Sequence, residues 1–340
     1  DGKLESHPMQ KELKTIRKKA DVFRDMAKKY KRNFGKAERD QRKALFQEAK
    51  NLMKEAEQIA QYIQKDILDQ AQVITATLVG SNHSAIQDRT YAAVFIDEAG
   101  QALEPACWIP ILKSDKLILA GDHLQLPPTI KSKDSSVRAF HETLMEKLVN
   151  VYPSCVCLLR QQYRMHQDIM QYPSAALYNN TLFAEPSIAQ QELTPGDNAF
   201  LFIDTAGAGF DEVQEDTAIS NIEEANFLIR HLTQYLAAFK KDENMSPFPN
   251  IGLISPYRQQ VLLLKELIRN DEMKISVSVQ IQTIDGFQGQ ERDIIYISLT
   301  RSNAEGQIGF LNEIRRMNVA MTRARYKLII IGDSSTIGQH

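Results

Sequence analysis

Two adjacent carboxylates follow a short apolar run in the first third of the chain. Residues 94–100 read VFIDEAG, so Asp97 and Glu98 come directly after a β-rich segment. A buried strand that ends in this pair can present one carboxylate to a magnesium ion and the other to a water molecule. Hydrolysis of a nucleoside triphosphate requires this arrangement. An Asp-Glu pair after a strand is common by chance, so the assignment depends on further motifs.

The next apolar run ends in a second polar motif. Residues 118–128 read ILAGDHLQLPP, which places Gln125 shortly after an expected strand. Its amide can form a hydrogen bond to a γ-phosphate, while Pro127 and Pro128 stiffen the loop that follows. The two motifs in succession favour triphosphate chemistry far more than the carboxylate pair does alone.

Arginines and turn-forming glycines supply the remaining candidates. Residues 161–166 read QQYRMH, with Arg164 just after another expected strand, and residues 282–293 read QTIDGFQGQERD. Residues 314–325, IRRMNVAMTRAR, are expected to form a helix with Arg316 and Arg323 on one side. An arginine at such a place can stabilise charge on a transferred phosphoryl group. The alternative is that these arginines lie on a solvent-exposed surface and have no role in the chemistry.

Residues 8–71 are expected to form an antiparallel helical hairpin, or stalk. Apolar residues recur in alternating steps of three and four, as in helices that pack along one stripe. Residues 33–36, NFGK, would form the turn. The pattern allows a lever, a protein-docking arm or a spacer. The two stripes are Leu13, Ile16, Ala20, Phe23, Ala27, Tyr30 and Phe34, and Leu45, Ala49, Leu52, Ala56, Ile59 and Ile63.

The rest of the chain is expected to be α/β. Continuous apolar runs favour parallel strands buried on both faces, with chemistry at the carboxyl ends of the first three. Alternation with helices implies two domains, residues 72–150 and 151–340. Strands are expected at 73–77, 93–96, 116–120, 155–159, 199–204, 251–254, 277–282, 294–299 and 328–332, helices at 135–149, 221–240 and 258–270, and surface loops at 185–196 and 207–216.

Charge and cysteine content narrow the class of protein. Of 41 basic and 43 acidic residues, 18 and 12 lie in residues 1–70, a balance of +6 against −8 for the remainder. A basic arm suggests a polyanionic or acidic partner, and a solvated helix face is an equal alternative. Cys107, Cys155 and Cys157, the last two expected on one face of a strand, are too few for a disulfide framework and indicate a reducing cytoplasmic or nuclear compartment. No run is long enough to span a membrane, so no membrane partner is expected.

Five motifs in order resemble motifs II to VI of superfamily 1 helicases: DEAG, GDHLQLPP, QYRMH, TIDGFQGQERD and RRMNVAMTRAR. The resemblance is greatest to the branch that includes the nonsense-mediated-decay RNA helicase and the immunoglobulin-mu-binding helicase. It runs from about residue 73 to the end, and the expected hairpin matches that branch's stalk. It implies two RecA-like P-loop NTPase domains, the first incomplete, with ATP between them and single-stranded DNA or RNA across their top.

The resemblance also implies a role for each candidate residue. Asp97 would hold Mg²⁺, and Glu98 would orient and deprotonate the attacking water. Gln125 would sense the γ-phosphate, and Arg164 and Arg323 would act as arginine fingers. In the nucleotide site, Tyr163 would stack on adenine, Glu291 would contact the ribose, and Gly289 would lie in the adjoining loop. The positions expected near the nucleic-acid track are Thr75, Thr77, Tyr257 and Thr283.

One feature of the family is missing from this sequence. None of its 15 glycines begins a G-x-x-x-x-G-K-S/T phosphate loop. With Asp1 in place of methionine, a fragment is expected, one that by itself binds ATP poorly. Two functions therefore stay open: an ATP-dependent 5′-to-3′ helicase or translocase acting as a monomer, or a non-catalytic module that binds nucleic acid or protein.

Overall fold

The structure is a computed structural model that describes residues 2–29, 35–128, 130, 142–239, 248–270 and 278–338. It divides into two compact units. Unit 1 comprises Asp1–Val94 and Pro105–Ile118, and unit 2 comprises Phe95–Glu104 and Leu119–His340. Across the described ranges, no helix has both the length and the apolar character needed to cross a membrane. The predicted domain limits 8–71, 72–150 and 151–340 stay predictions.

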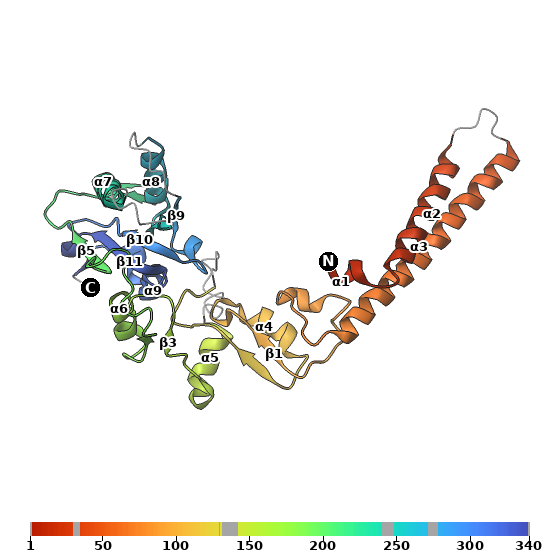
Figure 1. Ribbon diagram of the computed structural model, residues 1–340, viewed down its shortest axis with the longest axis horizontal. Coiled ribbons are helices and arrows are strands. Elements are labelled where there is room, and N and C mark those ends of the chain that lie inside the picture. The colour runs from red at the N-terminus through yellow and green to blue at the C-terminus, as the bar shows by residue number, and fades with distance from the viewer. Residues whose placement is uncertain are drawn as a thin grey trace. The chain divides into compact units, whose positions relative to one another are not determined.

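Unit 1 contains a helical hairpin (Figure 1). Helices α2 (Gln10–Lys28) and α3 (Lys36–Gln70) lie side by side after the short α1 (Gly2–Ser6). His7, just before α2, lies 3.2 Å from Asp66 near the end of α3, which shows that the helices are antiparallel. The predicted seam is confirmed, although Tyr30, Phe34 and part of the turn at 33–36 lie outside the described residues. Its buried members are Leu13, Ile16, Ala20, Ala27, Ala49, Ala56 and Ile63.

Two predicted strands do not form. Residues 73–77 have no regular structure before the 3₁₀ turn η1 (Val79–Asn82), and Val73 is 79% exposed. Cys155 ends the turn η4 (Pro153–Cys155), and residues 156–159 follow it as exposed chain without regular structure, so Cys155 and Cys157 share no strand face. An apolar run becomes a strand only if another strand accepts its hydrogen bonds. Neither segment has such a partner within the described ranges.

The strands that precede the first two motifs do form. β1 (Val94–Ile96) pairs with β2 (Leu117–Leu119) in a two-stranded sheet, and the chain passes between the units within both strands. The turn η2 (Ala99–Gln101) and helix α4 (Glu104–Ile111) lie between them in sequence. Helix α5 (Leu144–Val151) begins after Thr143, whose side chain accepts a hydrogen bond from Glu146 N at 3.1 Å. Of the predicted helix 135–149, residues 135–141 lie outside the described residues.

Unit 2 is built on a five-stranded parallel sheet in the order β5-β11-β10-β8-β9. The predicted strands of this sheet are confirmed with shifts of a few residues at their ends; residue 277 lies outside the described ranges. The central strands are buried on both faces, as continuous apolar runs indicate. The five strands are β5 (Phe200–Asp204), β8 (Ile251–Ser255), β9 (Val279–Thr283), β10 (Arg292–Ser298) and β11 (Ala324–Gly332).

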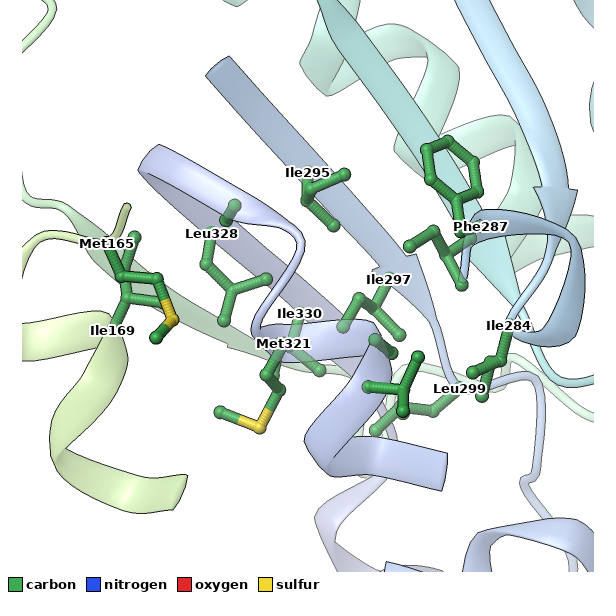
Figure 2. Packing of buried hydrophobic residues seen from close by; sticks show 14 of the residues in the cluster. Met165, Ile169, Ile284, Phe287, Ile295, Ile297, Leu299, Met321, Leu328 and Ile330 are labelled. Atoms are coloured by element: carbon green, nitrogen blue, oxygen red, sulfur yellow. The ribbon is translucent and has the colours of Figure 1, made fainter. Parts of the chain in front are cut away.

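Helices cover the two faces of this sheet. On one face, Ile295, Ile297, Leu328 and Ile330 pack with residues of α6 (Gln167–Leu177) and α9 (Ile314–Met321), as Figure 2 shows. On the other face, the alternate residues of β10 and β11 pack with α7 (Ile222–Phe239) and α8 (Arg258–Asn270). Helix α8 has the predicted bounds. Helix α7 begins one residue later than the predicted helix 221–240, whose residue 240 is not described.

The smaller elements lie around the sheet. A parallel pair, β3 (Gln161–Gln162) and β4 (Phe183–Ala184), flanks α6. The antiparallel pair β6 (Val213–Glu215) and β7 (Ala218–Ser220) places a strand where a surface loop was predicted at 207–216. Residues 185–196 form a loop, as predicted. The remaining elements are the turns η5 (Asp285–Phe287) and η6 (Gly309–Asn312) and the helix α10 (Ser334–Ile337).

A buried polar cluster joins α7 to the end of β10. Glu224 is fully buried, and its Oε1 accepts hydrogen bonds from Ser298 Oγ at 2.5 Å and Thr300 N at 2.9 Å. Gln260 donates to Ser298 Oγ at 3.0 Å and to the Asn221 carbonyl at 3.1 Å. Burial raises the pKa of Glu224 to about 7, because loss of water disfavours the carboxylate more than these hydrogen bonds favour it.

This carboxyl group should make the stability of unit 2 depend on pH. Because the folded-state pKa is raised from 4.5 to about 7, the folded protein binds the extra proton between these values. Its stabilising contribution is complete below pH 4.5 and is lost as the pH rises through 7. The loss should be on the order of 3 kcal/mol. Chemical denaturation at pH 5 and pH 8 should show this loss in the wild type and not in Glu224→Gln. Glu223 is the exposed neighbour, and the control Glu223→Gln should lose stability between pH 5 and pH 8 as the wild type does. The same change of stability with pH in the wild type and in both variants would contradict the raised pKa of Glu224.

Candidate functional site

The loops after β1 and β2 are held together by their backbones. Ala120 N donates to the Ile96 carbonyl at 2.9 Å, and Ala99 N donates to the Ala120 carbonyl at 2.8 Å. A Cβ on Gly100 would lie 2.6 Å from the Asp122 carbonyl oxygen. A Cβ on Gly121, whose φ is +153°, would lie 2.8 Å from Ala99 N. Only glycine permits this approach, and the carboxylate motif and the glutamine motif therefore lie side by side.

The carboxylate pair is accessible. Asp97 and Glu98 are both exposed at the carboxyl end of β1. Glu98 has a φ of 53°, a left-handed conformation that a non-glycine residue adopts at some cost and that is frequent at functional sites. Asp97 Oδ1 accepts a hydrogen bond from Glu98 N at 2.9 Å, and Glu98 Oε2 accepts one from Gln101 Nε2 at 2.6 Å. Each side chain is thus oriented by a neighbour while facing solvent.

Asp97 fits a magnesium ligand. Mg²⁺ is usually held by one or two carboxylates together with waters and substrate phosphates, not by a cage of protein ligands. Asp97 offers a carboxylate at an exposed strand end. Among the residues that the structure describes, no group of three or more His, Cys, Asp or Glu side chains could hold a metal by itself. Of the ligands that Mg²⁺ takes in such sites, Asp97 would supply one carboxylate.

Asp122 organises the glutamine loop. Its Oδ1 accepts a hydrogen bond from Leu124 N at 2.9 Å. Its Oδ2 accepts one from Gln125 Nε2 at 2.9 Å and one from the Tyr178 hydroxyl at 2.5 Å. Asn318 Nδ2 in turn donates to Tyr178 Oη and to the Leu124 carbonyl, each at 2.9 Å. The side chain of Gln125 is consequently fixed by its own loop, by the residue that caps α6 and by a residue of α9.

The arginine of the last motif lies at the amino end of β11. Arg323 is 3% exposed, and its Nη2 is 3.4 Å from Gln125 Oε1. It also donates to the Val319 carbonyl at 2.9 Å and the Gln290 carbonyl at 3.3 Å. Burial and the neighbouring charge of Arg164 lower the pKa of Arg323 to about 10, so the guanidinium stays charged near neutral pH.

A second arginine converges on the same place. Arg164 Nε lies 2.7 Å from Glu291 Oε2, and its Nη1 donates to the Thr322 carbonyl at 3.0 Å. The carboxylates of Glu98 and Glu291 both favour the charged form of Arg323. The structure therefore brings together Glu98, Gln125, Arg164, Glu291 and Arg323, which are spread over more than 200 positions of the sequence.

The predicted helix 314–325 is wrong at its end. Helix α9 stops at Met321, and Arg323 lies in the turn before β11. Arg316 points to another partner, with its Nη1 3.2 Å from Asp285 Oδ2. The two arginines do not share a helix face, because the chain must leave the helix at Thr322 to enter the sheet.

Two predicted nucleotide contacts are accessible. Tyr163 is 70% exposed, so an aromatic face is free to meet a planar base. Gly289 has a φ of +75° with no heavy atom within 4 Å of its Cβ position, which keeps the backbone open at the turn before Glu291. Stacking on adenine and contact with ribose stay predictions.

The predicted nucleic-acid residues belong to both units. Thr75 and Thr77 lie in unit 1 and are exposed; Thr77 Oγ1 accepts a hydrogen bond from a backbone N–H three residues on, at 3.0 Å. Thr283 ends β9 and is half-buried. Tyr257 is 4% exposed, and its hydroxyl donates to the Ile308 carbonyl at 3.3 Å. Tyr257 is therefore part of the packed interior, and its predicted contact with nucleic acid has no support from its position.

Sequence reasoning missed Asp122, Tyr178 and Asn318. Asp122 and Asn318 stand inside two of the quoted motifs, so their position was a usable signal. Tyr178 lies in ALYNN, outside every motif, and only the fold reveals its contact with Asp122.

The class of protein follows from comparisons with known families. The family described as an AAA domain matches residues 140–335, and a second family of the same description matches residues 3–133. The chain belongs to this AAA-domain family and, with the relatives named next, to the superfamily 1 helicases of the group that contains SMUBP-2 and Upf1. The resemblance drawn from the five motifs is confirmed.

Three relatives illustrate the group. The chain is 37% identical over 302 residues to the DNA polymerase alpha-associated DNA helicase A of Saccharomyces cerevisiae, a match covering 79% of the chain and 43% of the relative. It is 37% identical over 289 residues to the DNA-binding protein SMUBP-2 of Rattus norvegicus, covering 80% and 28%. It is 32% identical over 287 residues to the ATP-dependent helicase upf1 of Schizosaccharomyces pombe, covering 82% and 30%. The chain spans less than half the length of each.

The contact between the two motif loops can be tested at Gly121. Gly121→Ala would place a methyl group 2.8 Å from Ala99 N as well as straining the backbone. Gly207→Ala is the matched control, because Gly207 also has a positive φ (+74°) but no atom within 4 Å of its Cβ position. Chemical denaturation should show Gly121→Ala to be less stable than the control by roughly 1–3 kcal/mol. Equal losses would mean that the loops do not pack as described.

Proposed function

We propose that this chain forms part of the motor core of an ATP-dependent helicase or translocase that moves along single-stranded DNA or RNA. The observation that supports this most directly is the contact between Gln125 Oε1 and Arg323 Nη2, at 3.4 Å, beside Arg164 and within the electrostatic reach of Glu98. A charged arginine whose hydrogen bonds go to neutral acceptors can give up these hydrogen bonds and bind a polyanion instead. The relatives named above, which include a DNA helicase and an ATP-dependent helicase, point the same way.

Each residue has a definite task in this proposal. Magnesium, held by Asp97, would neutralise charge on the phosphates. Glu98 takes the proton of the attacking water, and its exposure at the end of β1 gives that water access. Gln125 contacts the γ-phosphate. Arg323 and Arg164 stabilise the charge that spreads over the transferred phosphoryl group.

The nucleotide also has to displace an existing partner. Glu291, proposed to contact the ribose, is paired with Arg164 at 2.7 Å. If Arg164 turns to a phosphate, Glu291 is released for the ribose hydroxyls while Tyr163 stacks on the base. Loss of the γ-phosphate after hydrolysis would let Arg164 and Glu291 pair again. This exchange offers a way for hydrolysis to alternate two states and so to advance a strand.

Further elements of the proposal concern partners. Stacking and phosphate contacts tolerate any sequence, so little base specificity and strong salt dependence are expected. The basic hairpin would lie near the nucleic acid or bind a protein partner. The protein would act as a monomer in the cytoplasm or nucleus. Because these 340 residues contain no phosphate loop, tests belong on the full-length protein.

The proposal is tested by ATP hydrolysis of the full-length protein with and without single-stranded DNA and RNA. We expect hydrolysis that nucleic acid stimulates. Nucleic-acid binding without any hydrolysis would instead favour the non-catalytic module.

Glu98→Gln should lower kcat by roughly 10²–10⁴-fold, because the amide cannot accept the proton of the attacking water. Affinity for ATP should be retained, as measured by equilibrium binding of a fluorescent ATP analogue. Glu223→Gln, a change of the same kind on the exposed face of α7, should leave kcat unchanged. Undiminished turnover in Glu98→Gln would exclude Glu98 as the base.

Arg323→Ala should lower kcat by about 10³-fold, the effect typical of an arginine that stabilises the transition state of phosphoryl transfer. Because Arg323 is buried, its thermal unfolding is measured alongside, with Arg323→Lys as a variant that keeps the charge but loses the planar fork. Arg230→Ala, at an exposed position of α7, is the control. A folded variant that changes only the KM for ATP would show that Arg323 binds substrate without acting in the chemical step.

A further inference from the structure

A directed chain of hydrogen bonds connects α6 and α9 to the glutamine of the proposed site. Asn318 donates to Tyr178 Oη, Tyr178 donates to Asp122 Oδ2, and Gln125 Nε2 donates to the same oxygen. Arg323 then donates to Gln125 Oε1. The first and last donors of this series of hydrogen bonds are close in sequence: Asn318 lies in α9, and Arg323 lies in the turn that follows this helix.

The direction of every bond is set by Asp122. An ionised carboxylate only accepts, so both Tyr178 and Gln125 must turn their protons toward it. With its one proton committed, the Tyr178 oxygen can only accept from Asn318. With its nitrogen toward Asp122, Gln125 presents Oε1 to Arg323 and keeps a second amide proton. That remaining N–H could donate a hydrogen bond to a γ-phosphate oxygen.

Asn318 confirms that donors are required here. Its Nδ2 donates twice, to Tyr178 Oη and to the Leu124 carbonyl. Among the described residues, no hydrogen-bond partner lies near its buried Oδ1. Rotation of the amide would place an acceptor against the Leu124 carbonyl oxygen, which is also an acceptor. The protein thus tolerates one orphan oxygen to keep both donors in place.

Tyr178 is suited to a constant role. It is half-buried and follows Leu177 directly, as the residue that caps the carboxyl end of α6. Burial and the adjacent carboxylate of Asp122 raise the pKa of the phenol well above its usual range, so the hydroxyl remains a donor at every physiological pH.

We propose that Tyr178 is a positioning residue for ATP hydrolysis: its hydroxyl holds Asp122, and through it the amide of Gln125, in the orientation that meets the γ-phosphate and Arg323. The inference rests on the proposed function. The Tyr178 hydroxyl contacts Asp122 and Asn318, so its proposed effect on the reaction passes through Asp122. It lets α6 and α9 respond to the occupant of the glutamine loop, since movement of Gln125 pulls on the same carboxylate.

The test is a double-mutant cycle in the full-length protein. Tyr178→Phe removes the hydroxyl and keeps the ring, Gln125→Ala removes the group that it positions, and the third variant combines them. Tyr178→Phe alone should lower kcat by about tenfold, the effect of one hydrogen bond to a charged group, with little change in the KM for ATP. In the Gln125→Ala background the same change should have no further effect, because Tyr178 then has nothing to position.

Controls separate positioning from folding. Tyr172→Phe removes a hydroxyl from a 54% exposed tyrosine of α6, the helix that Tyr178 caps, and should leave kcat unchanged. Thermal unfolding of each variant shows whether it is folded. If Tyr178→Phe does not fold, Asn318→Asp tests the same chain from its other end. Loss of its donors should lower kcat in the wild-type background and not in Gln125→Ala.

The outcomes are distinct. Additive losses in the cycle, or a normal kcat for folded Tyr178→Phe, would overturn the role of Tyr178 while Glu98-dependent hydrolysis by the wild type upheld the proposed function. A wild type with no Glu98-dependent hydrolysis would remove the proposed function and this inference with it.

Discussion

The parallel pairing of β10 with β11 is the constraint on which the second half of the site depends. Arg292 and Ala324 are partners in register, and Arg292 N donates to the Arg323 carbonyl at 2.9 Å. The residues just before each strand, Glu291 and Arg323, are thereby set beside one another at the amino edge of the sheet. A shift of register would separate them, and burial of both faces of these strands prevents such a shift.

A buried arginine without a carboxylate partner is the electrostatic consequence of that placement. Within the described ranges Arg323 makes no ion pair, and its hydrogen bonds go to carbonyls, an amide oxygen and a hydroxyl. Burying such a charge is unfavourable, which is why its pKa falls to about 10. In the proposed function, this charge meets a phosphate of the nucleotide. A phosphate group would relieve the repulsion between Arg323 and Arg164.

An element could be predicted from the sequence when the segments that pack or pair with it were also visible in the sequence. The strands of the five-stranded sheet were predictable, because their continuous apolar runs are buried on both faces, and α8 was predicted at its observed bounds. The hairpin was predictable because its two stripes complete each other. Residues 73–77 and 155–159 have the same composition as strands, but within the described residues no strand pairs with them. Propensity alone could not reveal that, since strand formation is a property of two segments.

The sequence by itself determined the chemistry: which residues are acidic, amide or arginine, their order along the chain, and membership of the helicase group through five motifs. Only the tertiary structure decided their relations. It moved Arg323 off the helix and against Gln125, placed Tyr257 in the interior, and brought in Tyr178 from outside every motif. The physical reason is that hydrogen-bond direction and burial depend on contacts between segments far apart in the chain, which motif spacing does not encode.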